Sequence, residues 1–182
     1  MMQTVNPRAA LTRRRLEKAF LELLEQKSIH QINIRELCAL AGVNRTTFYN
    51  HYGSQYDLLE DMSSRFLQSV QMRLTASGSE NVQERVELVL AYMQENLALS
   101  RLLLSRNEDA QFAGRLFSLP QISSLFEDAL CGVEDEQMRT AIIEFAIHGS
   151  YRLLQNWILQ EKRISPVLQT EQMLTLARRV CR

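Results

Sequence analysis

The sequence predicts an all-α protein, and three observations support this fold class. Apolar residues recur at the three- and four-residue spacing of an amphipathic helix along most of the chain. The 182 residues include only six Gly and three Pro, whereas Leu, Glu, Gln, Arg and Ala are frequent. No segment shows the regular alternation of apolar and polar residues that is typical of a half-buried strand. We therefore expect a globular chain built from helices alone.

The N-terminal third is expected to contain four helices of unequal length. Asn6 caps the first of them, and Asn33 and Asn44 cap two short helices. Ser54, with Asp57 three residues later, resembles a capping box at the start of a long helix. The four helices are expected at about 7–26, 34–41, 45–52 and 55–75.

Beyond a loop at 75–81 that contains Ser77, Gly78 and Ser79, the rest of the chain is expected to form further helices. Pro120 and the pair Ser165-Pro166 mark breaks between them. The segment 82–105 forms either one helix or two. The other helices are expected at about 109–119, 121–130, 134–161 and 170–180.

Charge is distributed unevenly along the chain. Residues 1–52 contain eight Lys or Arg and four acidic residues, which gives +4, and the remainder has 13 and 17, which gives −4. The total of zero would argue against a nucleic-acid binder, but the split indicates that the N-terminal part contacts a polyanion. A solvated helix face without a partner is the alternative.

The two short helices at 34–41 and 45–52, joined at Gly42, have the lengths and the glycine of a helix-turn-helix. In that motif the first helix braces the second, whose N-terminal half lies in the major groove of DNA. Phe48 and Tyr52, four residues apart, supply the inward edge of the second helix. The side chains left for the outside are of types that bind base edges and phosphates, namely Asn44, Arg45, Thr46, Thr47, Tyr49, Asn50 and His51.

The stretch from Ile34 to Leu59 resembles the helix-turn-helix and the start of the fourth helix of the TetR family of bacterial transcriptional regulators. The preceding segments 12–20 and 29–34 fit the family's first helix and connector, so the resemblance is specific over roughly residues 8–66. The C-terminal two thirds are similar in layout only. The resemblance implies a three-helix DNA-binding domain at 1–53 and a helical dimerisation and regulatory domain at 54–182.

The resemblance also implies roles for individual residues. Arg45, Thr46, Thr47 and Asn50 would contact bases. Contacts with DNA phosphates would come from Tyr49, His51, Asn33, Arg13, Arg14 and Gln55. Many relatives have Lys where Gln55 stands, which removes a charged phosphate contact, although the helix N-terminus still offers backbone N–H groups to an anion. The cluster of arginines at 13–15 either contacts DNA or is solvated.

The C-terminal helices are candidates for a dimer interface. Apolar residues cover more than one face of the segment 134–161, so this helix would pack on its own core and on a partner. Two such helices from each subunit would form a four-helix interface, as the resemblance implies. The expected interface residues are Ile142, Phe145, Ala146, Gly149, Leu153, Trp157, Met173 and Leu176. The alternative is that they form only the core of a monomer.

An effector is expected from the resemblance, and it would be either a small molecule or a protein partner. Candidate residues for a small-molecule pocket are Met62, Phe66, Tyr92, Met93, Phe117 and His148. A set of Met and aromatic residues at helical spacing is more often core than pocket, and His148 would equally serve as a core or interface histidine.

Other classes of protein are disfavoured. The three His are scattered, no metal-ligand spacing occurs and no Gly-rich phosphate loop is present, so we expect no enzyme, cofactor or metal. No run of 18 apolar residues and no signal peptide occurs, so we expect no membrane partner. Cys38, Cys131 and Cys181 are odd in number and far apart, as in a reducing cytoplasm. The expectation is a cytoplasmic homodimer that binds a palindromic double-stranded DNA operator, acting as a repressor.

Overall fold

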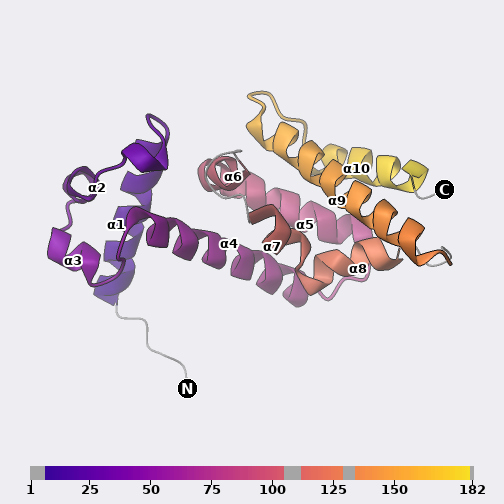
Figure 1. The fold of residues 1–182 in the computed structure, drawn as a ribbon, viewed down its shortest axis with the longest axis horizontal. Helices are drawn as coiled ribbons and strands as arrows, with labels where there is room; N and C mark the ends of the chain where they lie inside the picture. Colours follow the sequence, from indigo (N-terminus) through magenta and orange to yellow (C-terminus); the bar gives the residue numbers. More distant parts are fainter. Residues whose placement is uncertain (1–6, 105–111, 129–133, 181–182) are drawn as a thin grey trace, which may run out of the picture. The chain divides into compact units, whose positions relative to one another are not determined.

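The computed structural model describes residues 7–104, 112–128 and 134–180, and within these ranges all regular elements are helices (Figure 1). The predicted all-α class is therefore confirmed. The chain divides into two compact units, one up to Arg65 and one from Phe66 onward. The packing units therefore divide inside a long helix, and the domain boundary after Gly53 stays a prediction.

The first unit contains three helices, a short 3₁₀ turn and the first part of a fourth helix. Helix α1 buries Leu16, Ala19, Phe20 and Leu23, which recur at the spacing of one helix face. Helix α1 packs against α2. The expected cap Asn6 lies outside the described residues. The elements are α1 (Pro7–Leu24), η1 (Ile29–Gln31), α2 (Ile34–Ala41), α3 (Arg45–Tyr49) and α4 (Gln55–Ser77), of which α4 continues into the second unit.

The turn between α2 and α3 depends on Gly42. This residue adopts φ +63° and ψ 36°, a left-handed conformation that glycine reaches at little cost. Its N–H bonds the carbonyl of Ala39 at 3.3 Å, and the N–H of Val43 bonds the carbonyl of Cys38 at 2.9 Å. This pattern is a Schellman motif, which ends α2 abruptly and turns the chain into α3.

Helix α3 is shorter than the sequence predicts. Its regular part ends at Tyr49, whereas the expected helix ran to Tyr52. Residues 50–52 continue as a hydrogen-bonded turn, in which the N–H groups of His51 and Tyr52 both bond the carbonyl of Phe48 at 2.9 Å. The N-terminal cap is as expected, because the Asn44 side-chain oxygen accepts the Thr46 N–H at 2.9 Å.

The start of α4 resembles the capping box that the sequence predicts, but the return bond from Asp57 goes to Gly53 and not to the N-cap residue Ser54. The Asp57 N–H donates to Ser54 Oγ at 3.3 Å, and Asp57 accepts from the Gly53 N–H at 2.9 Å and from Ser54 Oγ at 3.0 Å. A Cβ atom on residue 53 would lie 2.9 Å from the Asp57 carboxylate, so Gly53 permits this close approach.

In its described residues, the second unit contains the rest of α4 and six further helices. Helix α10 packs on α5 and α9, and α6 packs on α9; Figure 1 shows α9 and α10 side by side. The helices are α5 (Val82–Glu95), α6 (Leu97–Leu104), α7 (Phe112–Phe117), α8 (Pro120–Asp128), α9 (Glu136–Leu159) and α10 (Pro166–Val180).

Two helix boundaries in the second unit have a local physical cause. The segment 82–105 is divided at Asn96, whose side-chain amide donates to the Tyr92 carbonyl at 2.9 Å and so satisfies an acceptor at the end of α5. Helix α10 begins at Pro166, earlier than the expected Thr170. Proline is well tolerated in the first turn because its missing N–H would have no helical partner there.

The core of the second unit combines aromatic packing with a few buried hydrogen bonds. The Phe66 ring lies 4.9 Å from that of Tyr92 and 5.8 Å from that of Phe112. Trp157 is 2% exposed, and its indole N–H donates to the Ile164 carbonyl at 2.9 Å. Buried Gln155 donates to the Leu104 carbonyl at 2.6 Å, which links α9 to the end of α6.

Candidate nucleic-acid interface

Helix α3 presents its polar side chains outward, as the sequence predicts. Phe48 is fully buried, and Tyr52 beyond the end of the helix is also buried. Four polar residues on and next to α3 are exposed or half-buried, and none of them is needed for the core. These are Arg45, Thr46 and Asn50, which are exposed, and Thr47, which is half-buried. Their chemistry suits hydrogen bonds to base edges.

The residues expected to contact DNA phosphates differ in their exposure and in their hydrogen bonds. Tyr49 is 50% exposed, and His51 and Arg14 are also exposed. Asn33 is exposed, but its side-chain oxygen accepts the Arg35 N–H at 2.8 Å and caps α2. Only the amide NH₂ of Asn33 would therefore remain for an anion.

Gln55 and its neighbour Tyr56 are directed toward the 3₁₀ turn η1. The Gln55 amide lies 3.5 Å from the Ile29 carbonyl as a donor, and the Tyr56 hydroxyl is 2.6 Å from His30 Nδ1. These two contacts link the start of α4 to the connector, and the role of Gln55 at a phosphate stays a prediction.

The three consecutive arginines on α1 do not share a face. Successive residues of a helix are rotated by about 100°, so three in a row cannot all point at one phosphate run. Arg13 turns toward α4, where its Nε lies 3.7 Å from Asp61 Oδ2. Arg14 and Arg15 are exposed. The arginine cluster of the sequence is thus divided between an internal ion pair and solvent.

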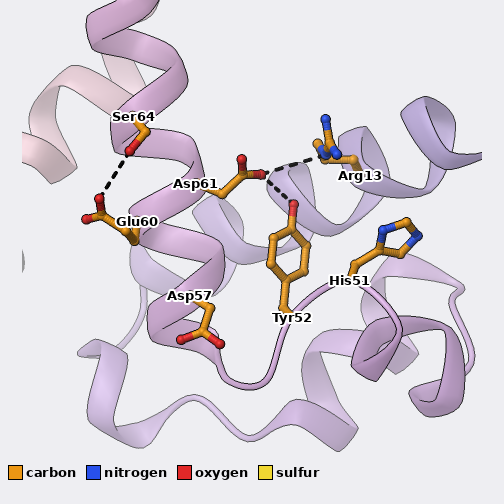
Figure 2. Close-up of a pocket in the computed structure, with 7 residues that line it drawn as sticks. All are labelled: Arg13, His51, Tyr52, Asp57, Glu60, Asp61 and Ser64. Carbon is orange, nitrogen blue, oxygen red and sulfur yellow. Dashed lines mark hydrogen bonds and ion pairs between the residues drawn. The ribbon is translucent and has the colours of Figure 1, made fainter. Parts of the chain in front are cut away.

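Arg13 belongs to a group of four charged side chains and one hydroxyl, which we call the charge cluster. Asp61 accepts a 2.7 Å hydrogen bond from the Tyr52 hydroxyl and lies 3.2 Å from Arg65 Nη2. Arg65 also donates to Glu17 on α1. Figure 2 shows Asp61 joined by dashed lines to both Arg13 and the Tyr52 hydroxyl. The charge cluster consists of Arg13, Glu17, Tyr52, Asp61 and Arg65, and it connects α1, the chain after α3, and α4.

The charge cluster borders an open pocket of about 440 Å³. Three carboxylates line this pocket, which makes it unfavourable for a phosphate group. His51 also lines the pocket, and its ring lies on the far side of Tyr52 from Asp57 and Glu60 (Figure 2). The lining residues are Arg13, His51, Tyr52, Asp57, Glu60, Asp61 and Ser64.

Burial and partners shift two pKa values in the charge cluster. Burial, reinforced by the hydrogen bond to Asp61, raises the pKa of the Tyr52 phenol above its ordinary value of 10.0. Burial alone would lower the pKa of Arg65, but the hydrogen bond and charge of Glu17, with the charge of Asp61, outweigh it and raise this pKa. Tyr52 therefore stays a neutral hydrogen-bond donor and Arg65 stays a cation.

The residues expected in a dimer interface have unequal exposure. Phe145 is 64% exposed and Leu176 45%, and Gly149 is exposed with open space where a Cβ would stand. Ile142, Ala146, Leu153 and Met173 are half-buried. Trp157 is buried within the single chain and so contributes to its own core.

The residues expected to line a ligand pocket are also divided. Phe66, Met93 and Phe117 are buried in the second unit and Tyr92 is half-buried there, whereas Met62 is buried and belongs to the first unit. His148 is exposed, and its Nδ1 lies 2.8 Å from the Glu144 carbonyl one turn earlier. The packing of the buried aromatic residues fits the core interpretation, and His148 is not part of it.

Family models match both parts of the chain. The model described as bacterial regulatory proteins, tetR family, matches residues 18–62, which include α2 and α3. The model described as transcriptional regulator C-terminal region matches residues 80–179, more than half of the chain. The chain belongs to the TetR family. It is a TetR-family transcriptional regulator with an N-terminal DNA-binding domain and a C-terminal regulatory domain.

Individual TetR-family relatives are distant. The HTH-type transcriptional regulator YxbF of Bacillus subtilis (strain 168) is 29% identical over 65% of this chain and 30% of that protein. The dhaKLM operon transcriptional activator DhaS of Lactococcus lactis subsp. lactis (strain IL1403) is 28% identical over 49% of this chain and 46% of that protein. The chain thus spans less than half the length of either curated relative.

A solved TetR-family structure shows the same fold. The TetR transcriptional regulator from Streptococcus agalactiae 2603V has a TM-score of 0.72 and 20% identity, and the match covers 93% of this chain and 95% of that one. No helix in the described part of this TetR-family chain is long and apolar enough to cross a membrane. Among the same residues, no three His, Cys, Asp or Glu side chains are grouped to hold a metal ion.

Sequence reasoning missed most of the charge cluster of this TetR-family chain. A signal was present, because Arg13 and Glu17 are four residues apart on one helix, and Asp61 and Arg65 are four apart on another. The two residues of each pair lie on one face of their helix. Their charges are complementary when Arg13 lies beside Asp61 and Glu17 beside Arg65. Nothing in the sequence says that α1 and α4 meet at these positions.

Proposed function

We propose that this regulator binds a palindromic double-stranded DNA operator as a homodimer and represses transcription. The exposed polar face of α3 is the observation that carries the proposal. Within this short helix Phe48 is the buried residue, and Arg45, Thr46 and Asn50 face solvent around it. A helix that gives so little to the core is better explained by a ligand outside the protein, and these side chains match base edges.

Base contacts are proposed for Arg45, Thr46, Thr47 and Asn50. Arginine matches the two acceptors of guanine, asparagine matches the donor and acceptor of adenine, and a threonine methyl packs on the methyl of thymine. Phosphate contacts are proposed for Tyr49, His51, Arg14 and the Asn33 amide. Arg13 and Gln55 are proposed phosphate contacts as well, through the N–H groups that Asp61 and the Ile29 carbonyl do not engage.

The homodimer is proposed from the apolar surface of α9 and α10. Phe145 and Leu176 are large apolar side chains with roughly half or more of their surface exposed, and Gly149 lies one turn from Phe145. Apolar residues gathered with a small one favour close helix packing against a second copy. A two-fold dimer would present two copies of α3 to half-sites about one helical turn apart.

Repression is proposed because a dimer that occupies a promoter excludes polymerase without needing any further surface. The relative DhaS carries the name of an activator, so the direction of regulation has its own measurement. A reporter gene behind the operator should be less active when the protein is present. Higher activity would replace repression by activation and leave the DNA-binding proposal intact.

The test begins with selection of bound DNA from a random pool, which should enrich a sequence with two-fold symmetry. Arg45→Ala should then weaken binding to that sequence by about 1–3 kcal/mol and relax the preference at one position of each half-site. Lys162→Ala, which removes an exposed cation outside the first unit, is the matched control and should leave the affinity unchanged. A pool without enrichment, or equal losses in both variants, would contradict the proposal.

A further inference from the structure

A side-chain hydrogen bond holds the chain that leaves α3 to the body of its unit. Tyr52 is the last residue before Gly53, where the chain turns into α4, and its hydroxyl donates to Asp61 at 2.7 Å. The ring of Tyr52 lies 5.8 Å from that of Phe48, the buried residue of α3. The position of Tyr52 therefore bears directly on the position of α3.

Asp61 is held from two further sides. Arg13 of α1 lies 3.7 Å from it, and Arg65 of α4 lies 3.2 Å from it and also donates to Glu17 of α1. Two cations and two carboxylates balance, so the cluster carries no net charge. A balanced and partly buried group of this kind fixes geometry more than it attracts a ligand.

A direct role of Asp61 in binding DNA is unfavourable, because its carboxylate would repel phosphates. Its hydrogen bond to Tyr52 offers an indirect role. Base reading requires that side chains be held close to the correct geometry by groups whose own positions are fixed.

We propose that Asp61 is a positioning residue for the recognition helix α3, acting through Tyr52, and that it also holds the partly exposed Arg13 side chain against α4. This inference rests on the proposed function of α3 in reading DNA. Loss of the Asp61 carboxylate leaves α3 less well placed and releases the cation of Arg13. Specific binding then weakens, while binding to unrelated DNA holds or strengthens slightly.

The test compares Asp61→Asn with Glu60→Gln. Both changes remove one negative charge from adjacent residues of α4, but Glu60 lies outside the charge cluster. Affinity for the selected operator and for unrelated DNA is measured by fluorescence anisotropy at a temperature where each variant is folded. Asp61→Asn should lower the ratio of specific to nonspecific affinity about ten-fold, because the Tyr52 hydroxyl would then donate at best to a neutral amide oxygen, and hydrogen bonds to charged groups are the stronger ones. Glu60→Gln should leave the ratio unchanged.

Tyr52→Phe is the milder variant, since it removes only the hydroxyl and keeps every charge. It should lower the ratio in the same direction, and the double variant Asp61→Asn with Tyr52→Phe should lose no more than Asp61→Asn alone. A ratio that stays constant while the melting temperature falls would show that Asp61 only stabilises the fold, and would overturn the proposal.

A measurement without DNA separates this proposal from the function on which it rests. In NMR spectra of the labelled full chain, the amide signals of Arg45–Tyr49 should shift in Asp61→Asn and in Tyr52→Phe, but not in Glu60→Gln. Signals that stay in place would overturn the positioning role. If these signals move while the wild-type protein prefers no DNA sequence, the positioning of α3 stands and the DNA-binding proposal fails.

Discussion

Tyr52 has a ring in the core and a hydroxyl in the charge cluster. The ring packs near Phe48, and the hydroxyl donates to Asp61 at 2.7 Å. Phe48 and Tyr52 could be predicted as inward residues because they are four positions apart on a helix with few other apolar residues. The partner of the hydroxyl could not be predicted, because it depends on which turn of α4 passes the end of α3.

The raised pKa of Tyr52 predicts a specific loss of stability at high pH. The unfolded phenol ionises near 10.0, while the folded phenol keeps its proton to higher pH. The unfolded state therefore binds fewer protons above this value, and the contribution of Tyr52 to the free energy of unfolding is complete below pH 10 and falls as the pH rises further. Urea unfolding of wild type and Tyr52→Phe should differ by a constant amount near neutral pH, and by a shrinking amount above pH 10. A difference that does not change with pH would refute this assignment.

At the scale of the element, asparagine caps could be predicted with little ambiguity. Asn33 and Asn44 each stand before a short apolar-periodic segment, and both side chains accept the N–H two residues later. The ends of helices are harder to predict from the sequence. Residues 50–52 have the composition of a helix, but the chain there turns so that Tyr52 reaches inward. The pair Ser165-Pro166 predicts a break, but proline also suits the first turn of a helix, and α10 begins at Pro166.

Helix α3 should depend on its cap more than its neighbours do. Five residues are too few to form a stable helix by themselves, so the Asn44 cap and the packing of Phe48 maintain it. Asn44→Ala should cost about 1 kcal/mol of stability and also weaken operator binding. Asn81→Ala removes an equivalent 2.9 Å cap from α5 and should cost a similar stability without affecting DNA. Urea unfolding and anisotropy measure the two effects, and equal DNA affinities of the two variants would count against the prediction.

At the scale of the whole molecule, the sequence predicts the division into a DNA-binding and a regulatory part, but it does not predict where the compact packing units divide. The break at Gly53 is a strong sequence signal, and the structure nevertheless keeps the first part of α4 with the first unit. The reason is a set of bonds from Gln55, Tyr56, Asp61 and Arg65 to residues earlier in the chain. Such long-range contacts leave no periodic pattern in a single sequence.

A prediction for the whole molecule concerns dimerisation through α9. A Cβ added at Gly149 meets no atom within 4 Å, so Gly149→Trp should be accepted by the single chain. It should nevertheless block close approach of a second α9, and sedimentation velocity should then show monomers where the wild type is dimeric. Gly114→Trp is the control, because Gly114 in α7 has equally open surroundings and should leave the dimer intact. A dimeric Gly149→Trp would place the interface elsewhere.

The balance of charges in the first unit has a consequence for how the protein would search along DNA. Residues 1–65 contain nine Lys or Arg and seven acidic residues, and the charge cluster takes two of each, so the +2 that remains arises outside it. A weak positive potential around the first unit gives slow association with DNA and a short residence time on unrelated sequences. Such a protein would travel by frequent release and rebinding, and its time on DNA would be concentrated at sites where α3 finds matching bases.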